Sequence, residues 1–183
     1  MSNTSSYITQ NSLLIENLLK FYNENNNMEK MLKIINGGSN ISLRIVDWFA
    51  TNYAKKYYTV YSLKNNQRFK VYMDYKLKLR AYSKKRFDPF CRWERINVPY
   101  KDGISIQTTI GQLNFFKWAL ENDVIEYIEN NYNLIEKDMN SRNSTSKRKV
   151  VINQQTRKKR EELSISATKS IKKENVEIVV KFD

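Results

Sequence analysis

A change in hydrophobic spacing along the chain limits the folds that it can adopt. Apolar residues recur at helical spacing over residues 12–56 and again over 109–139, which is typical of amphipathic helices. Between these segments, residues 57–74 alternate apolar and polar side chains, as strands do. We therefore expect an α+β fold, with four to five helices packed on a short antiparallel β-hairpin.

Three helices are expected before the hairpin. The first begins after Ser12, a favourable N-cap residue, and the second covers residues 28–36. Gly37 and Gly38 end the second helix, because glycine adopts the left-handed C-terminal conformation at little cost. The third helix covers residues 41–56.

The expected hairpin pairs residues 57–63 with residues 68–74 through the polar turn 64–67. The alternation continues to Tyr82, which leaves either one very long strand or a basic helix that begins at Asp74. We prefer the helix with Asp74 as its N-cap, because a strand from Arg68 to Tyr82 would exceed the usual strand length.

The clearest helical pattern starts at Thr109. Thr109 and Gln112 match a capping box at the start of an apolar helix face. Asn122 and Asp123 are expected to break this helix, and Asp123 to cap a second one that extends to Met139.

These patterns divide the chain into four parts. Residues 1–11 are expected to be disordered, and residues 12–139 to form a globular α+β domain. Residues 140–173 are polar and basic without periodicity, which predicts a linker or mobile arm. Residues 174–183 alternate as a strand does. This strand could join the hairpin as a third member or add to a partner protein.

Composition excludes several kinds of site. The chain has no histidine, so His-based triads and His metal ligands are ruled out, and Cys91 is the single cysteine. No pair of carboxylates has the spacing of a metal or acid–base site, so we expect neither catalysis nor a cofactor. No apolar run reaches the ~18–20 residues of a membrane span, and Met1-Ser2-Asn3 does not begin a signal peptide. We expect a reducing compartment.

Positive charge is concentrated in one part of the chain. There are 32 Lys and Arg against 19 Asp and Glu, a net charge of +13. Residues 54–102 hold fourteen of the basic and four of the acidic side chains, a net +10, among many tyrosines. Cations replace counterions on phosphate and rings stack on bases, so this segment favours nucleic acid binding. The alternatives are a solvated basic face with core tyrosines, and Lys and Asn enrichment through AT-rich coding.

The candidate nucleic-acid-binding residues fall into two groups. Those in the globular domain are Lys55, Lys56, Lys70, Lys76, Lys78, Arg80, Tyr82, Lys84, Lys85, Arg86, Arg92, Trp93 and Arg95. Those in the basic arm are Lys147, Arg148, Lys149, Arg157, Lys158, Lys159 and Arg160. No zinc-finger spacing or glycine-rich phosphate loop accompanies them, so sequence-specific recognition is not expected.

Three stretches resemble a known family. They are LRIVDWFATNYAKKYYTVY, YSKKRFDPFCRWERI and TTIGQLNFFKWALENDVIEYIENN, within residues 41–137. They are similar to uncharacterised proteins encoded by nucleocytoplasmic large DNA viruses. The resemblance implies a viral origin, and hence the cytoplasm or nucleus of a host cell, or packaging in the virion. It implies no site residues.

Two functions follow as expectations. The first is sequence-nonspecific binding of DNA or RNA, with phosphates contacted by the basic, tyrosine-rich surface. The alternative is a virion structural or assembly protein, whose basic surface and residues 174–183 contact other viral proteins.

Overall fold

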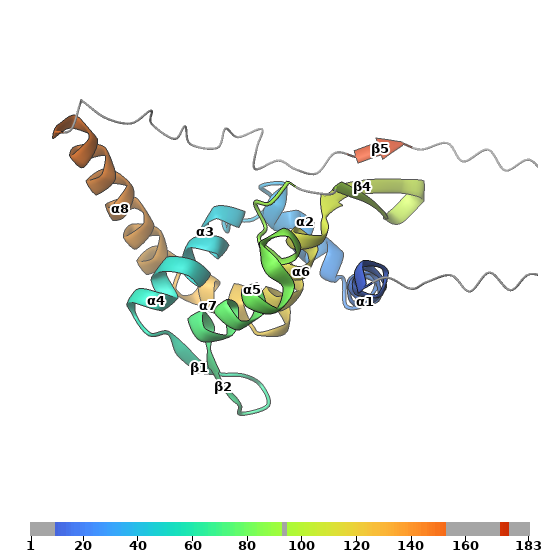
Figure 1. Cartoon of the computed structure of the whole chain (residues 1–183), viewed down its shortest axis with the longest axis horizontal. Helices are drawn as coiled ribbons and strands as arrows, with labels where there is room; N and C mark the ends of the chain where they lie inside the picture. Colours follow the sequence, from blue (N-terminus) through green and yellow to red (C-terminus); the bar gives the residue numbers. More distant parts are fainter. Residues whose placement is uncertain (1–9, 93–94, 153–172, 176–183) are drawn as a thin grey trace, which may run out of the picture.

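Helices make up most of the computed structural model, which describes residues 10–92, 95–152 and 173–175 (Figure 1). The strands form two small antiparallel sheets. α6 (Ile110–Glu121) is the central helix and contacts both α1 (Gln10–Asn23) and α5 (Val71–Phe87). The α+β fold class expected from the sequence is confirmed.

α1 and α2 (Asn27–Ile35) pack on each other at one end of the molecule. α1 begins at Gln10, so the predicted N-cap Ser12 lies inside the helix. Gly37 follows α2 with a φ of 76°, the left-handed conformation that the sequence predicts there. The Tyr22 hydroxyl donates a hydrogen bond of 2.6 Å to the Leu113 carbonyl and so joins α1 to α6.

The predicted third helix contains a π-helical turn. α3 (Leu43–Trp48) is followed by the π turn η1 (Phe49–Tyr53) and by α4 (Ala54–Lys56). The Thr51 hydroxyl donates a hydrogen bond of 2.7 Å to the Asp47 carbonyl. This bond competes with the α-helical bond that the same carbonyl would accept, and such competition disturbs regular helix geometry.

β1 (Val60–Ser62) and β2 (Arg68–Lys70) form the predicted hairpin, with Tyr61 opposite Phe69. The second strand is shorter than expected, because α5 begins at Val71. The prediction that Asp74 caps this helix is wrong. The Asp74 carboxylate accepts a hydrogen bond of 2.7 Å from the Trp118 indole on α6 instead.

A second sheet contains two strands, β3 (Arg95–Pro99) and β4 (Ile104–Thr109), that correspond to no element predicted from the sequence. β3 pairs with β4 across the 3-10 turn η2 (Lys101–Gly103). β5 (Lys173–Asn175) pairs antiparallel with β4. The start of the C-terminal strand therefore joins this sheet and not the β1–β2 hairpin, while residues 176–183 lie outside the described residues.

α6 begins as predicted, with the Thr109 hydroxyl accepting a hydrogen bond of 3.1 Å from the Gln112 N–H. The predicted break at Asn122 and Asp123 is also present, and α7 (Val124–Asn130) follows it. Asp123 has a left-handed φ of 52°, and its side chain does not cap α7 as expected.

α8 (Tyr132–Ile152) extends beyond the predicted end of the helical pattern at Met139. Residues 140–152 are therefore helical, where the sequence predicted a linker or arm. A helix that is anchored by buried Ile135 and Met139 can propagate through polar residues, because each further residue adds one backbone hydrogen bond. The C-terminal half of α8 projects away from the rest of the molecule (Figure 1). Residues 1–9 and 153–172 lie outside the described part of the chain.

Candidate nucleic-acid interface

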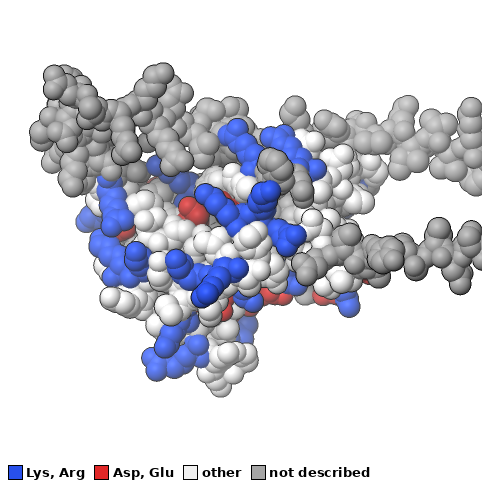
Figure 2. All heavy atoms as spheres, viewed as in Figure 1, with Lys and Arg blue, Asp and Glu red and all other residues white. Residues whose placement is uncertain are grey.

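Exposed cations gather where α4, β2 and the first turns of α5 meet. Lys55 and Lys70 line one cavity there, and Lys76 and Arg80 follow along α5, one turn apart. All four side chains are exposed, and we call this set the basic face. Figure 2 shows Lys and Arg spread over this side of the molecule, with few Asp and Glu among them.

The charges of the basic face are largely unneutralised. Within the described part of the chain, Lys70, Lys76 and Arg80 form no ion pair. Lys55 Nζ lies 5.7 Å from the centre of the Tyr72 ring, a cation–π contact that leaves its charge uncompensated. Unpaired, hydrated cations on one surface attract phosphate over roughly a Debye length, ~8 Å at physiological salt.

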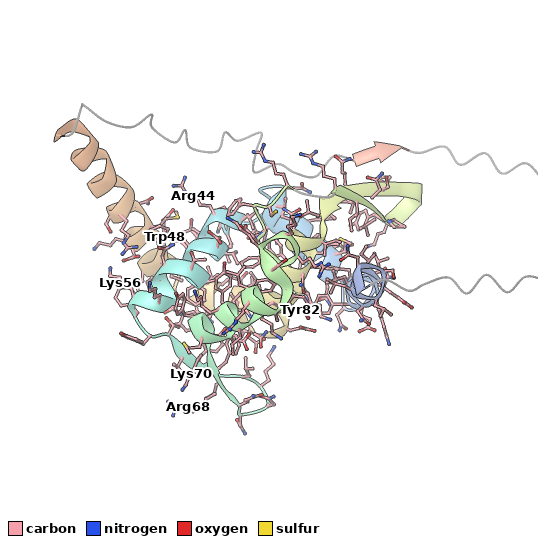
Figure 3. The ribbon with its side chains drawn as sticks, in the orientation of Figure 1. Arg44, Trp48, Lys56, Arg68, Lys70 and Tyr82 are labelled. Carbon is pink, nitrogen blue, oxygen red and sulfur yellow. The ribbon has the colours of Figure 1, made fainter. Side chains whose placement is uncertain are left out.

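Arg68 belongs beside this set, although the sequence analysis did not select it. It is exposed on β2, and Figure 3 shows it close to Lys70. Residues two apart on a strand point to the same side, so the strand pattern could have identified Arg68 once Lys70 was chosen.

Lys56, another predicted residue, is engaged in an internal cluster. Its ammonium pairs with Asp138 on α8, whose side chain is only 4% exposed. The same carboxylate accepts hydrogen bonds from the Trp48 indole at 3.1 Å and the Tyr57 hydroxyl at 3.3 Å. Burial alone would raise the pKa of Asp138, but the bond from Lys56 and the other two donors outweigh it, so the pKa is lowered. Lys56 therefore serves first to hold α8.

The remaining cations of α5 lie apart from the basic face. Lys78 is two positions from both Lys76 and Arg80, so it points to another side of the helix, and it is half-buried. Ser83 has a φ of 66° and kinks α5, which changes the direction of the residues after it. Lys84 pairs with Asp88 at 3.5 Å. Lys85 is exposed and Arg86 half-buried beyond the same kink.

The other predicted residues are spread over the rest of the chain. Arg92 is exposed in the loop before β3, and Arg95 donates a hydrogen bond of 3.0 Å to the Gln107 side chain on β4. Lys147, Arg148 and Lys149 are part of α8, and their side chains lie outside the described structure. Trp93 and residues 157–160 lie outside the described residues.

Most tyrosines of the basic segment lie in the core or pack against it. The Tyr61 ring stacks on Tyr127 with centroids 4.9 Å apart, and Tyr75 packs against Phe87 and Trp118 at 5.8 Å. Tyr82 is half-buried with its ring stacked on Phe87 at 6.1 Å. Two tyrosines of this segment are exposed in the described structure, Tyr57 and Tyr58. Stacking on a ligand would therefore fall to these two and to the half-buried Tyr72.

Asp47 is an unusual carboxylate beneath the C-terminal part of α5. Burial first, and then the nearby charge of Asp88, raise the pKa of Asp47 from the ordinary 3.8 to about 7, against the opposing effect of Lys84. A proton on Asp47 near neutral pH reduces the negative charge under the cations of α5.

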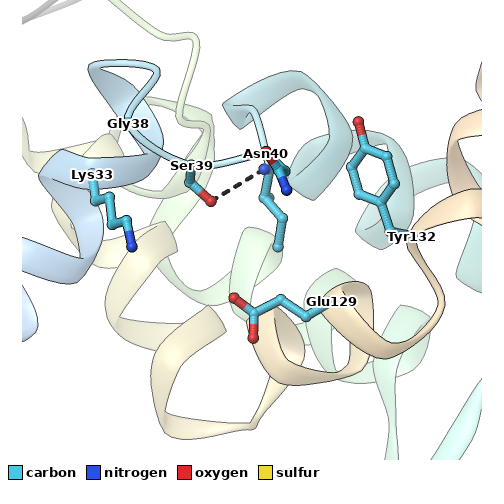
Figure 4. A pocket seen from close by; sticks show the side chains of 7 residues that line it. Lys33, Gly38, Ser39, Asn40, Glu129 and Tyr132 are labelled. Carbon is cyan, nitrogen blue, oxygen red and sulfur yellow. Dashed lines mark hydrogen bonds between the residues drawn. The ribbon is translucent and has the colours of Figure 1, made fainter.

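Two cavities differ in character. The cavity between α4, β1 and α5 has a volume of about 290 Å³ and a mainly apolar lining. The second, about 550 Å³, lies between the loop after α2 and the end of α7 (Figure 4). Lys33 and Glu129 at its edge are exposed, and Ser39 accepts a hydrogen bond of 3.1 Å from the Ile41 N–H of its own loop. This second cavity thus places no reactive side chain in a protected site.

No group of three Cys, Asp or Glu side chains in the described residues is arranged to hold a metal ion. None of the described helices is long and apolar enough to span a membrane.

Comparisons with known proteins agree with the resemblance seen in the sequence. The model of a family of unknown function (DUF7197) matches residues 2–182. Uncharacterized protein L507 of Acanthamoeba polyphaga mimivirus is 47% identical over 127 residues, which are 65% of this chain and 49% of that protein. The chain thus spans about half the length of this curated relative. No solved structure gives a significant match. The expected similarity to uncharacterised proteins of large DNA viruses is confirmed.

Proposed function

The chain belongs to the family of unknown function DUF7197, and from its basic face we propose that it binds nucleic acid without sequence specificity. The observation that carries the proposal is the basic face, in which Lys70, Lys76 and Arg80 are exposed and form no ion pair among the described residues. Lysine and arginine at such positions release counterions from phosphate when nucleic acid binds.

The test is fluorescence anisotropy of the full chain with labelled single-stranded DNA, duplex DNA and RNA over a salt series. The variant replaces Lys70, Lys76 and Arg80 by Glu. If each cation contacts one phosphate, the loss of all three contacts lowers the slope of log affinity against log salt by about 3 on duplex DNA. Unrelated sequences of equal length should bind the parent protein with similar affinities.

A matched control removes the same net charge elsewhere. Lys20, Lys30 and Lys33 are exposed on α1 and α2, outside the basic face, and their replacement by Glu changes the total charge equally. The proposal requires the first variant to lose affinity and salt dependence far more than the second. If both variants lose affinity equally, only the total charge of the protein matters. If binding does not depend on salt, phosphate contacts are not its basis.

The alternative expectation, a virion structural or assembly protein, stays a prediction. Residues 174 and 175 pair with β4 of the same chain, so a partner protein would have to bind residues 176–183 or displace β5. Deleting residues 174–183 should abolish capture of a viral partner and leave nucleic acid affinity nearly intact if this alternative is correct.

A further inference from the structure

An apolar cavity opens at the edge of the basic face. It lies where α4 ends, β1 begins and β2 passes into α5, and its walls include Lys55, Tyr58, Thr59, Lys70, Tyr72 and Met73. Its volume of about 290 Å³ is at the lower limit of small-molecule pockets, which suits a single ring system. Two cations therefore border a small, mainly apolar space.

Tyr58 stands at this cavity in a conformation that tyrosine rarely adopts. It has a φ of 48°, and the Thr59 N–H donates to the Ala54 carbonyl at 3.1 Å, as in a Schellman motif that ends a helix. Glycine usually occupies the left-handed position of that motif, and another residue there costs ~1–2 kcal/mol. Tyr58 is 86% exposed, so packing of its side chain within the described protein does not offset this cost. Strain of this kind points to a role for the side chain.

Thr59, the next residue, supplies an unsatisfied polar group. It is 8% exposed, and its Oγ1 has no hydrogen-bond partner in the described structure. A buried hydroxyl without a partner costs ~1–3 kcal/mol, which a polar atom of a ligand would recover once the Thr59 side chain turns toward the cavity. Met73, which also lines the cavity, is 59% exposed and supplies apolar surface there.

We propose that this cavity receives one unstacked base of a single-stranded nucleic acid. Tyr58 stacks on the base, the Thr59 hydroxyl bonds its polar edge, and Lys55 and Lys70 contact the flanking phosphates. The two lysines select this ligand over an apolar peptide side chain, which brings no negative charge to the rim. The proposal rests on the proposed function and makes it more specific, because a duplex keeps its base faces stacked and cannot offer one to the cavity.

The experiment compares three labelled probes of equal length with the full chain: oligothymidine, the same backbone with abasic residues, and a duplex. The test variant is Tyr58→Gly, which removes the ring while suiting the left-handed backbone, so it should fold at least as stably as the parent. Tyr58→Phe is the matched control, since it keeps the ring. Thr59→Val and Thr59→Ser form a second pair that removes or keeps the hydroxyl.

Stacking of a base on an aromatic ring contributes ~1–3 kcal/mol, which corresponds to roughly 5- to 150-fold in affinity. The parent should therefore prefer oligothymidine to the abasic strand by that factor, and Tyr58→Gly should lose the preference while its affinity for the abasic strand is unchanged. Tyr58→Phe and Thr59→Ser should retain the preference. If all three probes bind the parent equally and with steep salt dependence, the basic face binds phosphate but the base-binding cavity is refuted. If no probe binds, the proposed function itself fails.

Discussion

Asp47 gives the fold a dependence on pH that can be worked out from the structure. The carboxyl group of Asp47 has a pKa of about 7 in the folded protein and 3.8 in the unfolded chain. Between these two pH values it is protonated in the folded state and ionised in the unfolded state. The folded state then binds more protons than the unfolded state between these values, so stability falls as pH rises from about 4 to about 7. We predict that Asp47→Asn removes this loss.

The size of the effect follows from the same values. Each unit of pKa difference corresponds to about 1.4 kcal/mol, so the parent should lose at most about 2.8 kcal/mol between about pH 5 and about pH 8 through Asp47. Because the side chain keeps some contact with solvent, we expect about 1–2 kcal/mol. Relative to the parent, the free energy of unfolding of Asp47→Asn should therefore rise by about 1–2 kcal/mol between about pH 5 and about pH 8.

The assay is urea unfolding of the parent and Asp47→Asn at about pH 5, 6, 7 and 8. Glu24→Gln is the control, since it removes one carboxylate at an exposed position and makes the same change of charge. If the free energies of unfolding of parent and Asp47→Asn stay parallel over this range, the carboxyl group is ionised in both states and the reasoning is refuted.

Two further predictions concern packing away from the basic face. In Gly111→Ala the new Cβ would lie 2.7 Å from the Asp88 carbonyl oxygen, so thermal unfolding should show a loss of ~1–3 kcal/mol, whereas Gly38→Ala, with its nearest atom at 3.4 Å, should be close to neutral. Equal melting of the two variants would contradict the close approach. Asp138→Asn should cost ~1–2 kcal/mol at pH 7 through the weakened bond to Lys56. The lowered pKa of Asp138 makes its stabilisation decrease as pH falls below about 4, so urea unfolding should show a gap between parent and variant at pH 7 that narrows progressively in more acidic buffer.

Local signals in the sequence predicted the elements that depend on neighbouring residues. The Thr109 cap, the left-handed Gly37 and the β1–β2 hairpin each follow from a short segment whose residues satisfy one another. Asp74 shows where such reasoning ends. It is a good N-cap residue by type, but its partner is Trp118, 44 positions away, and α5 starts where Val71 is buried. The β3–β4 hairpin has Pro99 and Gly103 within it, and these interrupt the alternation by which strands are recognised.

The candidate interface was predictable in its charge but not in its geometry. The excess of cations in residues 54–102 identified the segment. It could not show that Lys56 pairs with Asp138, since that contact joins residues 82 positions apart. The exposure of each tyrosine depends in the same way on distant rings: Tyr61 is covered by Tyr127, and Tyr58 has no such partner among the described residues.

The ring contacts behind the β1–β2 hairpin bear on how a ligand would be received there. Tyr61 is held by its stack on Tyr127 and by a hydrogen bond of 2.7 Å from its hydroxyl to the Asn122 carbonyl. Phe69, opposite it, is buried with its ring 6.2 Å from Trp118. The backbone of both strands is thus fixed before any ligand arrives, so on association the protein loses conformational entropy only in its exposed side chains. We expect rigid docking, with an association rate set by diffusion and orientation.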